Sequence, residues 1–233
     1  MKQIIAMGGG GFSMEPDNPL LDQYVLQQTS KPRPKICFFP HATDSAVRYV
    51  NKFFTAFTQL DCTPSTLSLY ETPPMRDMAG FLLGQDAIYV GGGNTKSMLA
   101  LWREWNLDKI LRKCYDTGVV LAGISAGANC WFEEFVTDSA TPELNVMRNG
   151  LGFLPGSFCP HYDGEPLRRP TYQRMIANNE IKEGVACDDG AAAHYVDGVL
   201  ARVVSSRMGA KGYRLNQHQL RAIEAEVETH YLG

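Results

Sequence analysis

Residues 119–132 read VVLAGISAGANCWF, and this stretch decides how the rest of the chain is interpreted. The apolar residues Val119 to Ala122 come directly before the segment Gly123 to Gly127, which has Ser125 at its centre, and a run compatible with a helix follows it. An apolar run that ends in glycine is typical of a buried parallel strand that turns sharply into a helix. The stretch therefore predicts a strand–turn–helix unit with Ser125 at the turn.

The same pattern recurs elsewhere in the first half of the chain. Short apolar runs ending at glycine or other turn residues also occupy residues 4–7, 35–39 and 87–90. Between the runs, apolar residues follow helical spacing in residues 19–28, 46–60, 96–105 and 107–115. Alternating strands and helices predict parallel βαβ units with right-handed crossovers. We therefore expect an α/β fold, a parallel sheet flanked by helices, as a single domain over residues 1–233.

The last third of the chain has a different pattern. Two β-like runs, AAAHYV and VLARVVSS, flank Asp197-Gly198, a dipeptide that favours a tight hairpin turn. We therefore expect a C-terminal β-hairpin at this point. The charged segment from Gln217 to His230 is expected to form a final helix.

Composition argues against several classes of protein. The formal net charge is −3, with 22 Lys and Arg against 25 Asp and Glu, so no basic surplus points to nucleic acid. No apolar run approaches the ~20 residues of a membrane span, and the N-terminal stretch lacks a signal-peptide pattern. The six cysteines are scattered without a CxxC pair, which argues against a metal site and favours reduced thiols. We expect a cytoplasmic protein that binds neither nucleic acid nor a membrane and is either a monomer or a homodimer, two states that composition does not separate.

Ser125 lies in a G-x-S-x-G motif, Gly123 to Gly127, in the strand–helix setting that gives the motif its meaning. A serine at such a turn stands beyond the strand end, beside the free N–H groups of a helix N-terminus that favour negative charge. The motif therefore predicts a nucleophilic serine. The alternative is a glycine-rich turn in which Ser125 only caps the helix.

An acyl-transfer site also needs hydrogen-bond donors for an oxyanion. The N–H of Ala126, directly after the serine, is one candidate. A second is expected from Gly92 or Gly93, because glycines let backbone N–H groups approach a substrate closely. Asn94 and Thr95 in the same loop are candidates for hydrogen bonds to substrate. Phosphate binding is the alternative for this loop, but GGGNTKS lacks P-loop spacing, and the N-terminal GGGG completes no dinucleotide fingerprint.

A serine nucleophile needs an adjacent base, normally histidine. His161 and His41 both follow a proline at the end of an apolar run, where a loop faces the carboxyl edge of a parallel sheet. We expect His161 to be the base, and His41 is the second candidate. The carboxylate that orients the base is expected from Asp188 or Asp189, which spacing does not separate; Asp163 is a weaker candidate.

Two adjacent arginines, Arg168 and Arg169, follow His161 in the sequence. An arginine fork binds a carboxylate bidentately, so the pair could recognise an acidic substrate. The alternative for both residues is a solvated basic turn.

Three segments, GISAGANCWF, VGGGNT and CPHYDGEP, together resemble the peptidase E family of serine peptidases, to which cyanophycinase is related. The resemblance spans most of the chain, from the opening strand to the DDGAA segment. It implies a flavodoxin-like fold similar to class I glutamine amidotransferases, with serine in place of their cysteine nucleophile.

The resemblance also implies roles for individual residues. The implied catalytic set is Ser125, His161 and an acidic residue at 188–189, with an oxyanion hole from Gly92 or Gly93 and Ala126. The implied reaction is hydrolysis of small peptides, dipeptides with an N-terminal aspartate, without a metal or cofactor. Arg169 is expected to bind the aspartate side chain.

Two other functions are compatible with the residues. One is a non-peptidase esterase or amidase that uses the same serine, and the other is a catalytically silent, amidotransferase-like binding domain. A glutamine amidotransferase is disfavoured, because the turn carries serine and Cys130 lies five residues farther along the expected helix.

Overall fold

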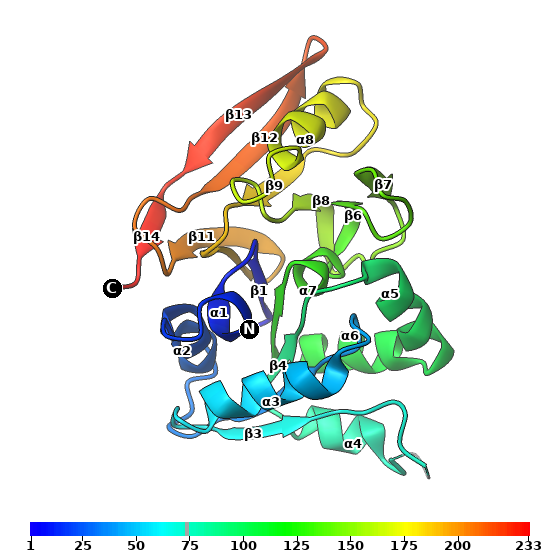
Figure 1. Ribbon diagram of the computed structural model, residues 1–233, viewed down its shortest axis with the longest axis vertical. Coiled ribbons are helices and arrows are strands. Elements are labelled where there is room, and N and C mark those ends of the chain that lie inside the picture. The colour runs from blue at the N-terminus through cyan, green and yellow to red at the C-terminus, as the bar shows by residue number, and fades with distance from the viewer. Residues whose placement is uncertain (73–74) are drawn as a thin grey trace.

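The computed structural model describes residues 1–72 and 75–233 and contains two β-sheets with helices packed on them (Figure 1). The larger sheet has eight strands, in the order β14 (Thr229–Tyr231), β11 (Val199–Ser205), β10 (Ala191–Val196), β1 (Gln3–Met7), β5 (Val120–Ile124), β4 (Ala87–Val90), β2 (Lys35–Phe39) and β3 (Thr63–Thr66). From β1 to β3 all neighbours are parallel, whereas β10 runs antiparallel to both β1 and β11.

The smaller sheet has six strands, in the order β13 (Arg221–Val227), β12 (Gly212–His218), β9 (Gly184–Cys187), β8 (Leu154–Cys159), β6 (Phe132–Thr137) and β7 (Asn145–Met147). The helices are α1 (Gly11–Met14), α2 (Leu20–Gln27), α3 (Ala46–Phe57), α4 (Met78–Leu83), α5 (Thr95–Glu104), α6 (Leu107–Thr117), α7 (Ala126–Asn129) and α8 (Arg168–Ala177). In the described parts of the chain, no helix combines the length and apolar character needed to cross a bilayer.

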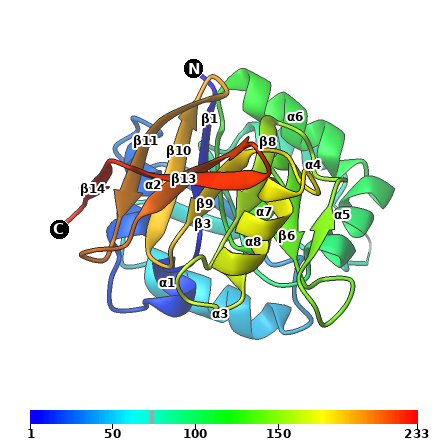
Figure 2. The same cartoon turned by 90° about the horizontal axis from the view of Figure 1, so that it is seen from above.

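Helices cover both faces of the larger sheet (Figure 2). Successive side chains of β1 point to opposite faces, as strand geometry requires. Ile5 and Met7 pack against α1, α2 and α3, while Ile4 and Ala6 belong to the core shared with α4, α5 and α6. Burial on both faces explains why these strands are apolar without interruption.

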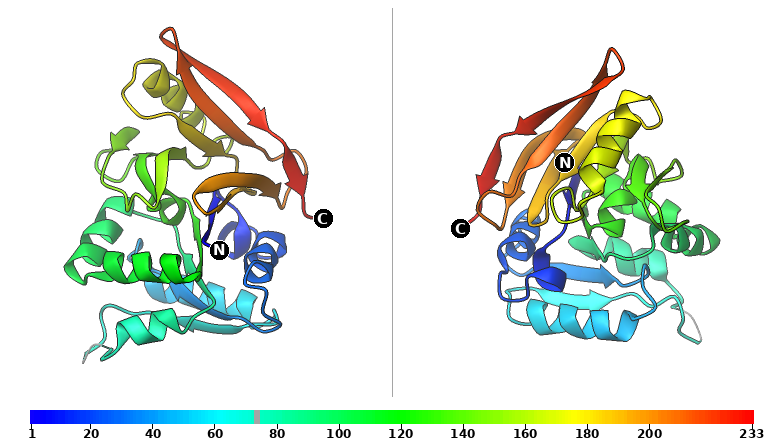
Figure 3. Two further views of the ribbon diagram at one scale, coloured as in Figure 1. Left: turned by 180° about the vertical axis from the view of Figure 1, so that it is seen from behind. Right: turned by 45° about the horizontal axis from the view of Figure 1, so that its top comes forward.

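A third apolar core lies under α8, on the smaller sheet. It includes Tyr162, Tyr172 and Met175, together with Tyr213 and Leu215 of β12. Figure 3 shows the β12–β13 hairpin extending beside α8. The loop that follows β8 is therefore held between α8 and the smaller sheet, and this loop carries one of the expected catalytic residues.

The α/β class, the parallel sheet flanked by helices and the C-terminal hairpin are confirmed. The four predicted strands and the four predicted helices form close to their expected positions, and β10 and β11 pair antiparallel around Asp197-Gly198. Asp197 and Gly198 both have positive φ, as a tight hairpin turn of this kind requires.

The predicted final helix at Gln217 to His230 is wrong. The segment forms the end of β12, then β13 and β14, and β13 pairs antiparallel with β12 over its whole length. Gln219 and Leu220 form the turn at φ 47° and 59°. Neither residue is typical of a turn with positive φ, so the sequence carries no glycine or asparagine signal for this hairpin.

Candidate active site

Ser125, at the turn between β5 and α7, has a strained backbone. Its φ is 56° and its ψ is −113°, a combination that residues other than glycine rarely adopt. A Cβ atom on Gly123 would lie 2.1 Å from the carbonyl oxygen of Gly127, and one on Gly127 would lie 2.2 Å from that of Val90. Both glycines are therefore required for the turn to close against itself and against the end of β4.

The Ser125 side chain does not cap α7. The helix has no side-chain hydrogen bond at its N-terminus, and Ser125 Oγ lies 2.8 Å from Nε2 of His161 instead. The alternative interpretation of the motif, a capping serine, is therefore wrong. Helix α7 is also shorter than the run after Ser125 predicts: it ends at Asn129, so Cys130 lies just past it and Phe132 begins β6.

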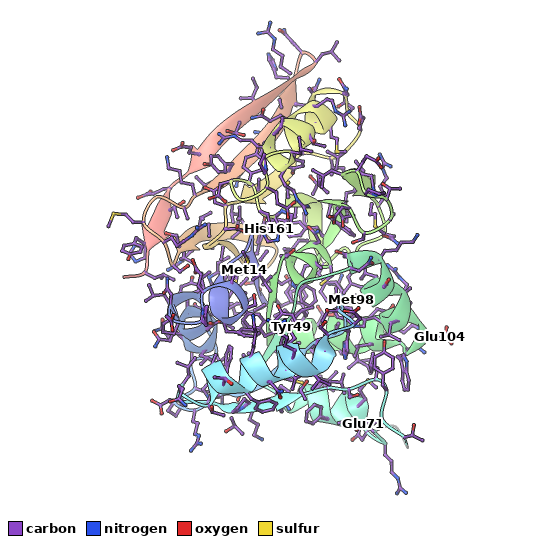
Figure 4. The ribbon with its side chains drawn as sticks, in the orientation of Figure 1. Met14, Tyr49, Glu71, Met98, Glu104 and His161 are labelled. Carbon is purple, nitrogen blue, oxygen red and sulfur yellow. The ribbon has the colours of Figure 1, made fainter. Side chains whose placement is uncertain are left out.

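His161 follows β8 and lies where the two sheets meet (Figure 4). Its Nδ1 is 2.6 Å from Oδ1 of Asp189, on the opposite side of the ring from Ser125. A carboxylate can only accept a hydrogen bond, so Nδ1 carries the proton and Nε2 is left to accept from the serine hydroxyl. Ser125, His161 and Asp189 thus form one continuous hydrogen-bonded row.

Asp189 is held as a carboxylate at the end of β9. Burial raises its pKa, but the hydrogen bond from His161 and the nearby positive charge of Arg207 outweigh burial and bring the pKa below its ordinary value. Its backbone N–H donates to Asp163 Oδ1 at 2.7 Å. Asp163, the weaker candidate for the carboxylate, therefore supports the position of Asp189 and does not bond to the histidine ring.

Two glycines enclose the Asp189 carboxylate. A Cβ atom on Gly9 would lie 1.9 Å from Asp189 Oδ1 and 3.0 Å from Nδ1 of His161, and one on Gly164 would lie 2.1 Å from Asp189 Oδ2. The N-terminal glycine run is thus part of the site, a role that sequence reasoning missed because it tested the run only as a nucleotide-binding motif. The sequence contains a signal for this role, because the run directly follows the predicted strand at residues 4–7. In the structure this strand, β1, is the parallel neighbour of β5, so the two strand ends lie at the same edge of the sheet.

Arg207 is a second residue that sequence reasoning missed. Its Nη2 donates to the carbonyl oxygen of Asp189, and its Nε lies 3.3 Å from Glu15 Oε1. The Nη2 atom of Arg207 also lies 3.5 Å from Asp163 Oδ2. Arg207 belongs to none of the motifs that point to the site, so only the folded chain reveals its position.

Asp188 is placed away from the histidine. It is only 4% exposed, and its Oδ2 accepts hydrogen bonds from the N–H of Lys211 at 2.9 Å and from the Tyr213 hydroxyl at 3.3 Å. Burial raises its pKa. The structure therefore brings Asp189, and not its neighbour, into the row with Ser125 and His161.

The glycine loop after β4 lies beside the serine. A Cβ atom on Gly92 would lie 3.8 Å from Ser125 Oγ. Most backbone N–H groups of this loop have acceptors: Gly91 donates to Phe39 O at 3.0 Å, Gly92 to Tyr49 Oη at 3.2 Å, Asn94 to Ala42 O at 2.7 Å and Thr95 to Ser139 Oγ at 2.9 Å. Among the residues that the structure describes, the N–H groups of Gly93 and Ala126 have no acceptor.

Asn94 and Thr95 make contacts within the protein. Asn94 Oδ1 accepts from the N–H of Ser97 at 2.9 Å and so caps α5, while its Nδ2 donates to the carbonyl oxygen of Ser139 at 3.0 Å. Thr95 is 1% exposed. Both residues hold the segment around Ser139 against the glycine loop.

Arg168 and Arg169 begin α8 and are both engaged with glutamates. Arg168 is buried, and its Nε donates to Glu165 Oε2 at 2.7 Å. The guanidinium of Arg169 pairs with Glu224 of β13 and lies 5.3 Å from the centre of the Tyr162 ring. Neither arginine stands in the row of Ser125, His161 and Asp189.

His41, the second candidate for the base, is a structural residue. Its Nδ1 accepts from the indole N–H of Trp102 at 2.9 Å, and its Nε2 lies 2.9 Å from the carbonyl oxygen of Leu67. Both ring nitrogens are therefore occupied. Burial lowers the pKa of His41 to about 4, so the ring is neutral at neutral pH.

Comparisons with known proteins agree on one family. The sequence model of peptidase family S51 matches residues 4–203. A protein of Bacillus subtilis (strain 168) named "Uncharacterized peptidase YgaJ" is 55% identical over 233 residues, covering all of both chains. Peptidase E of Haemophilus influenzae is 25% identical over 228 residues, which cover 91% of this chain and 98% of that protein.

Solved structures show the same fold at lower identity. A peptidase from an acI-B1 Actinobacterium superimposes with a TM-score of 0.71, at 15% identity, over 97% of this chain and 94% of its own. A putative peptidase E from Listeria monocytogenes EGD-e superimposes with a TM-score of 0.63, at 20% identity, over 90% and 100%. The family model and the 55% identical relative show that the chain belongs to peptidase family S51, and the protein is a peptidase hydrolase.

Proposed function

We propose that the protein is a serine peptidase that hydrolyses short peptides, with Ser125 as the nucleophile, His161 as the general base and Asp189 as the residue that orients His161. The observation that carries the proposal is the row of hydrogen bonds from Ser125 Oγ to His161 at 2.8 Å and from His161 to Asp189 at 2.6 Å. A serine on a strained turn, next to an imidazole whose Nε2 can accept its proton, is prepared to lose that proton.

The proposed reaction passes through an acyl-enzyme. Nε2 of His161 accepts the hydroxyl proton as Ser125 Oγ attacks the carbonyl carbon of the peptide bond. When the tetrahedral intermediate collapses, the C–N bond breaks and His161 protonates the leaving amine. Water, deprotonated by His161, then attacks the ester, which releases the acid and restores the Ser125 hydroxyl.

The proposed oxyanion hole consists of the N–H groups of Gly93 and Ala126. Both lack an acceptor among the described residues, whereas the N–H of Gly92 already donates to Tyr49. An oxyanion supplies the missing acceptor at the moment its charge develops, and donors that are already in place need no reorganisation.

The short substrate in this proposal follows from the resemblance to the peptidase E family. The narrower part of the proposal is a preference for dipeptides with an N-terminal aspartate, read by Arg169. Glu224 pairs with this arginine in the structure, so a substrate carboxylate would have to take the place of Glu224.

The substitution Arg169→Ala tests this preference. We expect it to raise the KM for Asp-X dipeptides by about tenfold or more and to change the KM for neutral dipeptides little, because it removes a charged hydrogen-bonding partner of one side chain only. Arg174→Ala is the matched control, since Arg174 lies on the same helix and pairs with Glu180 at 2.7 Å. Equal effects of Arg169→Ala on both substrate classes would remove Arg169 from recognition.

A dipeptide library, combined with a serine-reactive fluorophosphonate, tests the function itself. The expected result is cleavage of a subset of dipeptides and a single adduct that peptide mapping places on Ser125. Hydrolysis of p-nitrophenyl acetate without any dipeptide cleavage would favour an esterase instead. Absence of both dipeptide cleavage and the adduct would contradict the proposal.

A further inference from the structure

The loop Gly91–Gly92–Gly93 needs an external support if it is to present a fixed hydrogen-bond donor. Three consecutive glycines have more backbone freedom than any other tripeptide, and ordering them costs conformational entropy. A donor stabilises a transition state strongly only if its direction is set before the reaction. Contacts from outside the loop must therefore hold it in one conformation.

One side of the loop is held by the carbonyl oxygen of Ala42. It accepts the N–H of Asn94 at 2.7 Å. Gly93 has φ 137°, and a Cβ atom there would lie 2.2 Å from the same oxygen, so the backbone of Gly93 lies directly against it.

The other side of the loop is held by Tyr49 of α3. Its hydroxyl oxygen accepts the N–H of Gly92 at 3.2 Å, and a Cβ atom on Gly91 would lie 2.6 Å from its ring. The ring is fixed between Phe38 and Phe12, with ring centres 4.9 Å and 5.6 Å away. Figure 4 places Tyr49 on the α3 side of His161. Burial raises the pKa of Tyr49, so the hydroxyl stays neutral near pH 7.

We propose that Tyr49 is a positioning residue for catalysis: its hydroxyl fixes the N–H of Gly92 and thereby directs the N–H of Gly93 at the oxyanion. The inference rests on the proposed function of Ser125. Since Tyr49 binds Gly92, the amide of Gly93 is the loop N–H left for substrate. Gly92 lies against the serine, because a Cβ atom on Gly92 would lie 3.3 Å from Ser125 Cβ. A shift of the Gly92 backbone is therefore transmitted directly to the reacting atoms.

The substitution Tyr49→Phe removes the hydroxyl and keeps the ring that packs against Gly91. We expect kcat to fall about tenfold or more while KM changes less than about twofold, because the lost interaction acts on the transition state and not on the bound substrate. A short peptide aldehyde, which adds to Ser125 and forms an oxyanion-like adduct, should lose affinity by a similar factor. A purely structural role for Tyr49 would not separate kcat from KM in this way.

Tyr89→Phe is the matched control. Tyr89 is a buried tyrosine packed against the same Phe12 and Phe38 rings, and its hydroxyl lies 3.5 Å from Met7 Sδ, not on the loop. We expect Tyr89→Phe to retain kcat within about twofold, and thermal unfolding of both variants shows whether the fold is kept. A folded Tyr49→Phe protein with the kcat and aldehyde affinity of the parent would overturn the inference.

Ser125→Ala, assayed in parallel, separates failure of the inference from failure of the proposed function. An inactive Ser125→Ala protein beside a fully active Tyr49→Phe protein overturns the role of Tyr49 alone. Retained activity in Ser125→Ala would overturn the proposed function, and the role of Tyr49 with it.

Discussion

Replacing Ser125 with alanine is expected to lower kcat for dipeptide hydrolysis by about 10⁴-fold or more, because the substitution removes the atom that would form the acyl-enzyme in the proposed reaction. The hydroxyl is the group that lies 2.8 Å from His161, and without it the histidine has no proton to accept from the protein. The remaining donors and binding contacts still stabilise attack by water, so a small residual rate is expected. The measurement is product release under saturating substrate.

Two controls make this result interpretable. Ser97→Ala removes an exposed hydroxyl at the start of α5 and should leave kcat unchanged. Thermal unfolding of Ser125→Ala should remain cooperative, because the glycines on either side of the turn are still present. Turnover of a folded Ser125→Ala protein at the parental rate would exclude Ser125 as the nucleophile.

Asp189→Asn is expected to lower kcat by roughly 10³- to 10⁴-fold with little change of shape. The carboxylate accepts the Nδ1 proton of His161 at 2.6 Å, whereas an asparagine can donate its amide N–H to Nδ1 and so reverse the tautomer. Nε2 would then carry a proton and could no longer accept one from Ser125. The effect should appear in kcat and leave affinity for a product-like peptide largely unchanged.

The adjacent residue offers the sharpest control for this prediction. Asp188→Asn makes the same chemical change one position earlier, at a buried side chain that bonds Lys211 and Tyr213 and not the histidine. We expect it to retain most of the activity, even if the free energy of unfolding falls by about 1 kcal/mol. An activity loss as large in Asp188→Asn as in Asp189→Asn would contradict the assignment of Asp189.

The fold was predictable where the signals are local. A parallel strand that is buried on both faces must be apolar throughout, and a turn with positive φ favours residues such as Asp197 and Gly198. Both patterns lie within a few consecutive residues. The last hairpin was not predicted, because its turn at Gln219 and Leu220 lacks the local residues that usually mark a turn with positive φ.

The site was predictable only in part. The turn motif points to Ser125 and the position after a predicted strand points to His161, and the structure brings these two side chains together although they are 36 residues apart. Spacing could not choose between Asp188 and Asp189, which lie at the same strand end. Successive side chains of an extended segment point to opposite sides, so one of the two meets the histidine and the other faces β12.

The amino-acid sequence alone thus determined the α/β class, the turn that presents Ser125 and the histidine that follows a strand, because each depends on neighbouring residues. Tertiary structure alone decided that Asp189 bonds His161, that Gly9 leaves room for this carboxylate, and that Tyr49 binds the glycine loop. These contacts join side chains and backbone from separate strands and helices. Their partners are chosen by how the sheets and helices pack, and local residue patterns do not record that packing.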